Sequence, residues 1–134
     1  MHSKKYADTD FFLALLKDSG SLKEKAKKVY EKNKDSICVS PFTIAELMIV
    51  CVREDIPLKE TLFQMSRIVG TTFIRWNVYF EAAEYVEQKV TVFDALLMAF
   101  SKESERAFDD KSEIISSDKV YQKFGFSVIA VSYT

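Results

Sequence analysis

Short β-prone runs alternate with helical patterns along the whole chain, and this alternation narrows the possible folds more than any other feature. The runs cover residues 6–7, 36–39, 72–75, 113–116 and 126–131. Between them, apolar residues recur at i, i+4 and i+7, as on one face of a helix. The three clearest stripes consist of Leu22, Ala26 and Val29, of Leu58, Leu62 and Met65, and of Val78, Ala82 and Tyr85. The alternation predicts βα units, and therefore an α/β fold with a mainly parallel sheet.

Two helix starts and one helix end carry local signals. Ser40 followed by Pro41 pairs a capping residue with a first-turn proline, and predicts a helix that runs to about residue 54. Thr91 and Asp94 have the spacing of a capping box, and predict a helix that runs to about residue 102. Gly125 predicts the end of a helix before the last strand.

Length and composition are typical of one globular domain. The chain has 134 residues, 48% of them hydrophobic, with three Gly and two Pro, so we expect a single compact domain over residues 1–134. Apolar stretches such as residues 47–52 are too short to cross a bilayer, and the N-terminus lacks the apolar core of a signal peptide. We therefore expect a cytoplasmic protein with no membrane association.

The cysteines and the single histidine limit the kinds of metal site. Cys38 and Cys51 lie in apolar neighbourhoods, and we expect two buried thiols rather than a disulfide. His2 lies at the terminus, so a zinc site made of His and Cys lacks ligands. Any metal ion in this protein must be held by oxygen atoms.

Charge is uneven along the chain although the net charge is −1. Residues 1–34 carry nine Lys against five acidic residues. The lysine-rich run over residues 23–28 could contact RNA phosphates through Lys25 and Lys28, or could simply be a solvated helix face. Taken alone, the run favours the solvated face.

Two acidic residues follow predicted strands. Asp8 comes after the first β-prone run, and Asp118 comes two residues after the run that ends at Ser116. In parallel sheets, ligands collect at the carboxyl ends of the strands, so both carboxylates are candidates for a binding site. Each could instead cap the helix that follows, and Asp10 could cap the first helix in place of Asp8.

Two further acidic residues stand alone in apolar helices. Glu46 is the one charged residue in 41–52, and we expect it to be buried and to need a partner, either in a functional site or in an ion pair with Arg53. Asp94 is the one charged residue in 91–100, where it could serve only the capping box. Within about 4 Å, each like-charged pair would cost about 4 kcal/mol at an effective dielectric of 20. A cluster of these acids would need either a cation or raised pKa values, and all-oxygen ligands suit Mg²⁺ or Mn²⁺.

Four short acidic motifs resemble those of PIN domains, in their order and spacing, and the resemblance extends over essentially the whole chain. The motifs are Asp8-Thr9-Asp10-Phe11-Phe12, Ile44-Ala45-Glu46-Leu47, Phe93-Asp94-Ala95-Leu96 and Ile115-Ser116-Ser117-Asp118-Lys119. The resemblance implies a three-layer α/β/α fold with a mainly parallel five-stranded sheet. It also implies a metal-dependent endoribonuclease that leaves 5′-phosphate products.

The same resemblance assigns roles to residues and partners. It implies that Asp8, Glu46, Asp94 and Asp118 hold one or two Mg²⁺ or Mn²⁺ ions, and that a metal-activated water attacks the phosphodiester. Thr9, Asp10 and Ser116 would orient those ligands. The spacing looks most like VapC-type toxins, which implies an RNA substrate, a small antitoxin partner and a homodimer.

The sequence departs from the family at two places. The first strand reads Lys4-Lys5-Tyr6-Ala7 where the family is usually strongly apolar, and the connection over residues 104–112 is long and charged. Two other functions remain as alternatives. A haloacid-dehalogenase-like phosphatase also begins with Asp-x-Asp after a strand, but predicts a strongly apolar strand before Asp8 and a second acidic pair near the end. A non-catalytic PIN-like module that binds RNA or protein would be expected to have lost acidic residues.

Overall fold

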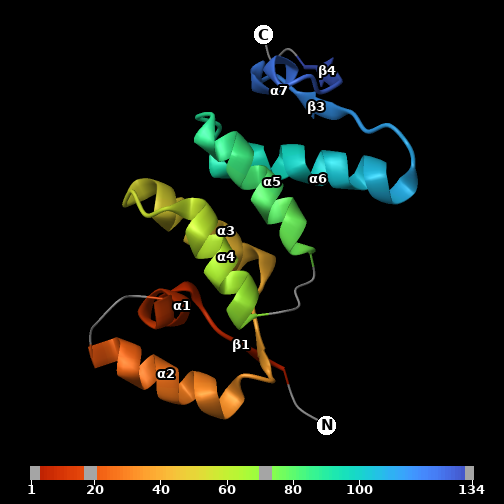
Figure 1. Cartoon of the computed structure of the whole chain (residues 1–134). Coiled ribbons are helices and arrows are strands. Elements are labelled where there is room, and N and C mark those ends of the chain that lie inside the picture. The colour runs from red at the N-terminus through yellow and green to blue at the C-terminus, as the bar shows by residue number, and fades with distance from the viewer. Residues whose placement is uncertain (1–3, 17–20, 70–73, 132–134) are drawn as a thin grey trace. The chain divides into compact units, whose positions relative to one another are not determined.

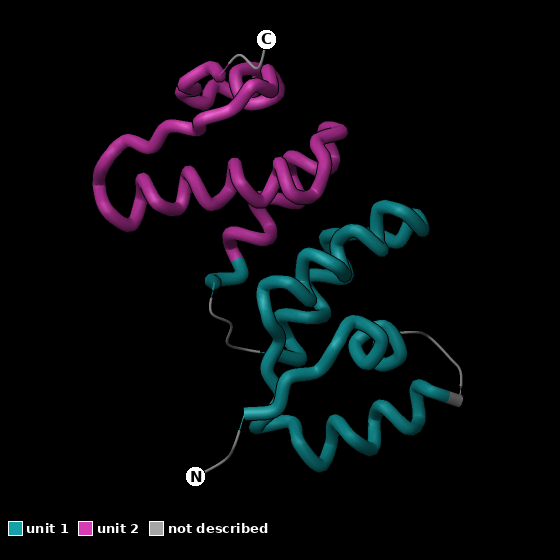
Figure 2. The backbone as a smooth tube through the Cα atoms, turned by 180° about the vertical axis from the view of Figure 1, so that it is seen from behind, with its two compact units in different colours: residues 1–76 teal, residues 77–134 magenta. Residues whose placement is uncertain are grey.

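The structure is a computed structural model that describes residues 4–16, 21–69 and 74–131 (Figure 1). The chain divides into two compact units, residues 1–76 and residues 77–134, shown in different colours in Figure 2. Seven helices and four strands lie in the described part of the chain. Each unit is described below by itself.

Unit 1 contains two short parallel strands and four helices. Its elements are β1 (Lys5–Tyr6), α1 (Thr9–Leu16), α2 (Ser21–Asn33), β2 (Ile37–Cys38), α3 (Pro41–Arg53) and α4 (Leu58–Ile68). β1 and β2 pair in parallel, with Lys5 opposite Ile37 and Tyr6 opposite Cys38. α1 packs against α2, α3 and α4. The fully buried side chains of Phe12, Ile44, Met48, Leu62 and Met65 form the core of this unit.

Unit 2 contains the second parallel pair. Its elements are α5 (Trp76–Glu87, which begins at the last residue of unit 1), α6 (Val92–Phe108), β3 (Ile114–Ser116), α7 (Val120–Lys123) and β4 (Val128–Ala130). β3 pairs with β4 in parallel, with Ile115 opposite Ile129. Buried residues of α5 and α6, among them Tyr79, Ala82, Met98 and Ala99, form its core.

The local signals for helices are confirmed. Ser40 caps α3, because its hydroxyl oxygen accepts a 3.1 Å hydrogen bond from the backbone N–H of Thr43. α6 follows Thr91 as expected, but it continues to Phe108, so half of the charged segment 104–112 is helix. Ion pairs from Lys102 and Arg106 on α6 to Glu81 on α5 support this extension. Gly125 follows α7 with a φ of 83°, the left-handed conformation expected at a helix end.

The parallel pairing of strands is also confirmed, but the five-stranded sheet is not seen in the described residues. Four strands of two or three residues form two separate pairs. A further strand was expected over residues 72–75. Residues 72 and 73 lie outside the described residues, and Ile74 and Arg75 are not in a strand. His2 also lies outside the described residues. β1 has only exposed residues, Lys5 and Tyr6, so no apolar run holds it in a sheet interior.

No helix in the described part of the chain is long and apolar enough to cross a membrane. Cys38 and Cys51 are free thiols; Cys51 is buried as expected, whereas Cys38 is half-buried.

Candidate active site

Asp8 lies just after β1 and caps α1. Its Oδ1 accepts a 3.1 Å hydrogen bond from the backbone N–H of Phe11, and its carboxylate is exposed. The position at a strand end and the capping role, which were alternatives from the sequence, therefore both occur. Asp8 lines a hollow beside β1 and α2, together with Tyr6, Val29 and Asn33.

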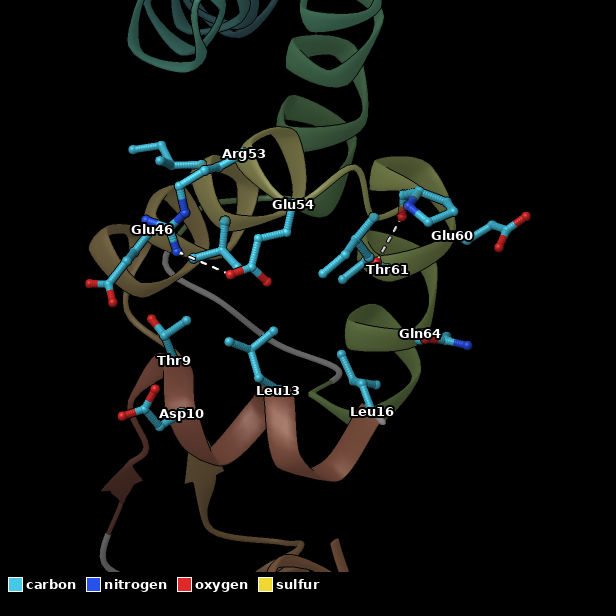
Figure 3. Close-up of a pocket in the computed structure, with 14 residues that line it drawn as sticks. Thr9, Asp10, Leu13, Leu16, Glu46, Arg53, Glu54, Glu60, Thr61 and Gln64 are labelled. Atoms are coloured by element: carbon cyan, nitrogen blue, oxygen red, sulfur yellow. Dashed lines mark hydrogen bonds and ion pairs between the residues drawn. The ribbon is translucent and has the colours of Figure 1, made fainter. Parts of the chain in front are cut away.

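The next two residues line a different cavity, which lies among α1, α3 and α4 (Figure 3). Its volume is about 800 Å³. Thr9 is 4% exposed at the start of α1, whereas Asp10 is exposed. Figure 3 shows Asp10 on α1 and Glu46 on α3 at the same end of this cavity. Unit 1 thus brings Glu46 together with the Thr9-Asp10 pair, and places Asp8 in the neighbouring hollow.

Acidic residues outnumber basic ones around this cavity. Among the described residues, its acidic lining residues are Asp10, Glu46, Glu54 and Glu60, and its one basic lining residue is Arg53. Apolar side chains of Leu13, Leu16, Ile49, Val50 and Ile56 complete the wall. Such a cavity favours cations over anions.

The expectation that Glu46 is buried is wrong: its side chain is exposed. α3 buries Ile44, Leu47 and Met48 but leaves Phe42, four residues before Glu46, 84% exposed. The helix is therefore apolar without being enclosed, and Glu46 lies on its open face. Because the carboxylate of Glu46 is exposed to solvent, it does not need a partner to offset a cost of burial.

Arg53 was the alternative partner for Glu46. In the structure its guanidinium forms an ion pair of 3.6 Å with Glu54, and both side chains are largely exposed. The described contacts of Arg53 include no ion pair with Glu46. Glu46 is thus left with its carboxylate at the end of the cavity.

In unit 2, Asp94 is held by two hydroxyl groups. Thr91 Oγ1 donates a 2.9 Å hydrogen bond to Oδ2 of Asp94, and the Tyr121 hydroxyl donates a 2.8 Å hydrogen bond to Oδ1. Thr91 is the N-cap residue of α6, but its side chain makes no capping bond to the backbone. The arrangement is therefore not an ordinary capping box, in which the threonine oxygen accepts from the backbone.

Asp118 lies after β3, as predicted, and is held in a tight turn. Its backbone N–H donates a 2.9 Å hydrogen bond to Oγ of Ser116. Its Oδ1 accepts one of 2.9 Å from the backbone N–H of Val120. Ser116 thus contacts Asp118 through the backbone N–H of that residue, and not through its carboxylate. The side chain of Asp118 remains exposed at the carboxyl end of β3.

Tyr121 is a residue that the sequence analysis missed. Its ring is 4% exposed, and burial, followed by the hydrogen bond to Asp94, raises the pKa of its hydroxyl to about 12. The negative charges of Asp94 and Asp118 both contribute to this raised pKa, so both carboxylates lie near the same phenol. Unit 2 thereby brings Asp94 and Asp118 into one neighbourhood. The signal in the sequence that could have identified Tyr121 as a site residue is its position as a polar aromatic residue three positions after Asp118.

Lys25 and Lys28 are exposed on α2. Their exposure allows contact with phosphates, and it equally fits a solvated helix face.

Within unit 1 and within unit 2, the described residues include no group of three His, Cys, Asp or Glu side chains close enough to hold a metal ion.

The candidate donor atoms that lie near one another within each unit are oxygen atoms. They are carboxylate oxygens, on Glu46 and Asp10 in unit 1 and on Asp94 and Asp118 in unit 2, with hydroxyls of Thr9 and Ser116 beside them. Oxygen donors of this kind suit Mg²⁺ and Mn²⁺.

The chain belongs to the PIN domain family, whose profile matches residues 5–126. This range spans both units and includes all four acidic motifs. PIN domains are mostly metal-dependent nucleases, and they typically use divalent metal ions. No curated protein and no solved structure matches the chain in the corresponding comparisons.

Proposed function

We propose that this protein is a Mg²⁺- or Mn²⁺-dependent endoribonuclease, and that it is the toxin of a VapBC-type pair. The observation that carries the proposal is that the PIN family match, over residues 5–126, includes all four acidic motifs in order. Family membership favours hydrolysis of nucleic acid over the phosphatase alternative. A PIN-like module without activity would not need all four acids.

In this proposal the cation ligands are the carboxylates of Asp8, Glu46, Asp94 and Asp118. Thr9, Asp10 and Ser116 orient them; the hydrogen bond from the Asp118 backbone to Ser116 supports that role for Ser116. The proposal keeps the single three-layer domain with a mainly parallel five-stranded sheet that the sequence predicts.

The reaction is the hydrolysis of an RNA phosphodiester. The oxygen of a water attacks phosphorus, the bond to the 3′ oxygen breaks, and the products carry a 5′-phosphate and a 3′-hydroxyl. The divalent cation, when bound, supplies Lewis-acid activation of water and neutralises charge on the phosphate. The carboxylates of the protein bind and orient that cation. Lys25 and Lys28 bind the RNA backbone outside the reacting centre.

The biological setting is part of the same proposal. We propose that the protein acts in the cytoplasm, forms a homodimer, and is silenced by a small antitoxin that covers the acidic site. A cavity with four acidic residues and one arginine supports a partner segment with basic side chains.

The proposal is tested by incubating the purified full chain with a labelled single-stranded RNA, in Mn²⁺ or in a chelator. We expect cleavage in Mn²⁺, none in chelator, and 5′-phosphate ends on the products. Asp118→Asn should abolish cleavage, whereas Asp110→Asn, which changes an exposed acid outside the motifs, should not. Equal RNA integrity with and without Mn²⁺ would favour a non-catalytic PIN-like module.

A further inference from the structure

We propose that Tyr121 is a positioning residue of this site, whose hydroxyl holds the Asp94 carboxylate in the orientation needed to bind a divalent cation. The proposal rests on the proposed function, because it concerns the same carboxylates. It adds a residue outside the four acidic motifs and outside the hydroxyl pair Thr9 and Ser116. Tyr121 and Asp94 both lie in unit 2.

The first step is the geometry of Asp94. Each oxygen of its carboxylate accepts one hydrogen bond from a hydroxyl, Oδ1 from Tyr121 at 2.8 Å and Oδ2 from Thr91 at 2.9 Å. A carboxylate has about four lone-pair sites. Two of these sites are used, so each oxygen retains a lone pair for a cation. The two hydroxyl donors fix the rotation of the Asp94 side chain and leave lone pairs of both oxygens accessible to a cation.

The second step is the setting of Tyr121. Its ring is buried and lies on α7, far along the chain from Asp94 on α6. A buried ring has few alternative rotamers, so its hydroxyl has a defined position. The hydroxyl of a tyrosine is protonated throughout the neutral range, so it is available as a donor to Asp94.

The third step connects the two proposed ligands of unit 2. Asp118 accepts a hydrogen bond from the backbone N–H of Val120, the residue before Tyr121. The same short segment thus holds Asp118 through its backbone and Asp94 through its side chain. Because the hydroxyl of Tyr121 bonds only the Asp94 carboxylate of this pair, its loss should disturb cation binding at Asp94 while the packing of the ring remains.

The matched variants are Tyr121→Phe and Tyr85→Phe. Both remove a hydroxyl from a buried tyrosine of unit 2, but Tyr85 contacts Lys102, Phe124 and Phe126 and no proposed ligand. Loss of a partner that orients a metal ligand typically costs 10- to 100-fold in metal affinity or activity. We expect Tyr121→Phe to raise the Mn²⁺ concentration for half-maximal cleavage by about 10-fold or more. Saturating Mn²⁺ should restore most of the maximal rate.

The control separates positioning from folding. Tyr85→Phe should leave the Mn²⁺ dependence within about 2-fold of wild type, at a similar change in melting temperature. An unchanged Mn²⁺ dependence in Tyr121→Phe, or equal shifts in both variants, would overturn the proposal.

Calorimetric titration with Mn²⁺ distinguishes failure of the positioning role of Tyr121 from failure of the proposed function. If wild type does not cleave RNA but binds Mn²⁺, weaker binding by Tyr121→Phe alone still supports the positioning role, and equal binding overturns it. If wild type does not bind Mn²⁺, both proposals are wrong.

Discussion

The hydroxyl of Tyr121 donates a 2.8 Å hydrogen bond to the carboxylate of Asp94, across 27 residues of chain. This bond joins the first turn of α6 to α7 within unit 2. With the bond from Thr91, it accounts for the orientation of a carboxylate that the sequence offered either as a metal ligand or as part of a cap. It also changes what a substitution of Asp94 should do.

Asp94→Asn should abolish cleavage and lower the stability of the metal-free protein. From the sequence alone, the effect on stability depends on the role of Asp94: stability is unchanged or higher if Asp94 belongs to a repulsive cluster, and lower by roughly 0.5–1 kcal/mol if it belongs only to a capping box. The structure instead gives Asp94 two charge-assisted hydrogen bonds, and their weakening should cost about 1–2 kcal/mol. Thr91→Val removes one of these bonds, so it should cost less stability and keep part of the activity. Denaturant melts paired with RNA cleavage assays measure both effects; a fully active Asp94→Asn would remove Asp94 from the site.

Lys25→Glu combined with Lys28→Glu should weaken RNA binding and flatten its dependence on salt. Both lysines are exposed on α2. Each contact with a phosphate of single-stranded nucleic acid contributes about 0.7 to the slope of log affinity against log salt, so two lost contacts predict a change of about 1.4. The matched control reverses two exposed lysines of unit 2, Lys111 and Lys123, by the same charge. The same slope in wild type and the α2 variant would make α2 a solvated face.

Ser40→Ala should lower the free energy of unfolding by about 1 kcal/mol, because it removes the N-cap of α3. The hydroxyl of Ser40 accepts from the backbone N–H of Thr43, and Ala has no acceptor to replace it. Ser104→Ala, at an exposed position within α6, serves as the control and should change stability little. Urea denaturation measures both. Equal stabilities of the two variants would show that the cap contributes nothing.

Gly125→Ala should lower stability by about 1–2 kcal/mol, because φ at this residue is 83° and a Cβ disfavours the left-handed region. A Cβ at this position meets no atom within 4 Å, so strain in the backbone is the cause rather than a clash. Asn tolerates this conformation better than Ala, so Gly125→Asn should lose less stability. Thermal or urea melts that rank Ala as the milder change would contradict this account.

Features with a local cause could be predicted from the sequence. The start of α3 follows Ser40, because a capping side chain acts within one turn of helix. The start of α6 follows Thr91, which lies within one turn of Asp94 and bonds its carboxylate rather than the backbone. The positions of Asp8 and Asp118 after strands were predicted for a similar reason, since each follows its strand within two residues.

Features that depend on distant parts of the chain could not be predicted in the same way. The exposure of Glu46 depends on which face of α3 its neighbours α1 and α4 cover, and the composition of α3 does not contain that information. The bond between Tyr121 and Asp94 depends on the return of the chain after α6. The strands have two or three residues each, too few to show from periodicity how they assemble into sheets.

The central proposal is that the carboxylates of the four acidic motifs bind a divalent cation. Calorimetric titration of Mn²⁺ into the metal-free full chain tests it most directly, with Glu46→Gln from unit 1, Asp94→Asn from unit 2, and the exposed Glu87→Gln as control. We predict that wild type and Glu87→Gln bind Mn²⁺ with equal affinity, and that each of the other two variants binds at least about 10-fold more weakly. Wild-type affinity in Glu46→Gln or in Asp94→Asn would contradict this proposal.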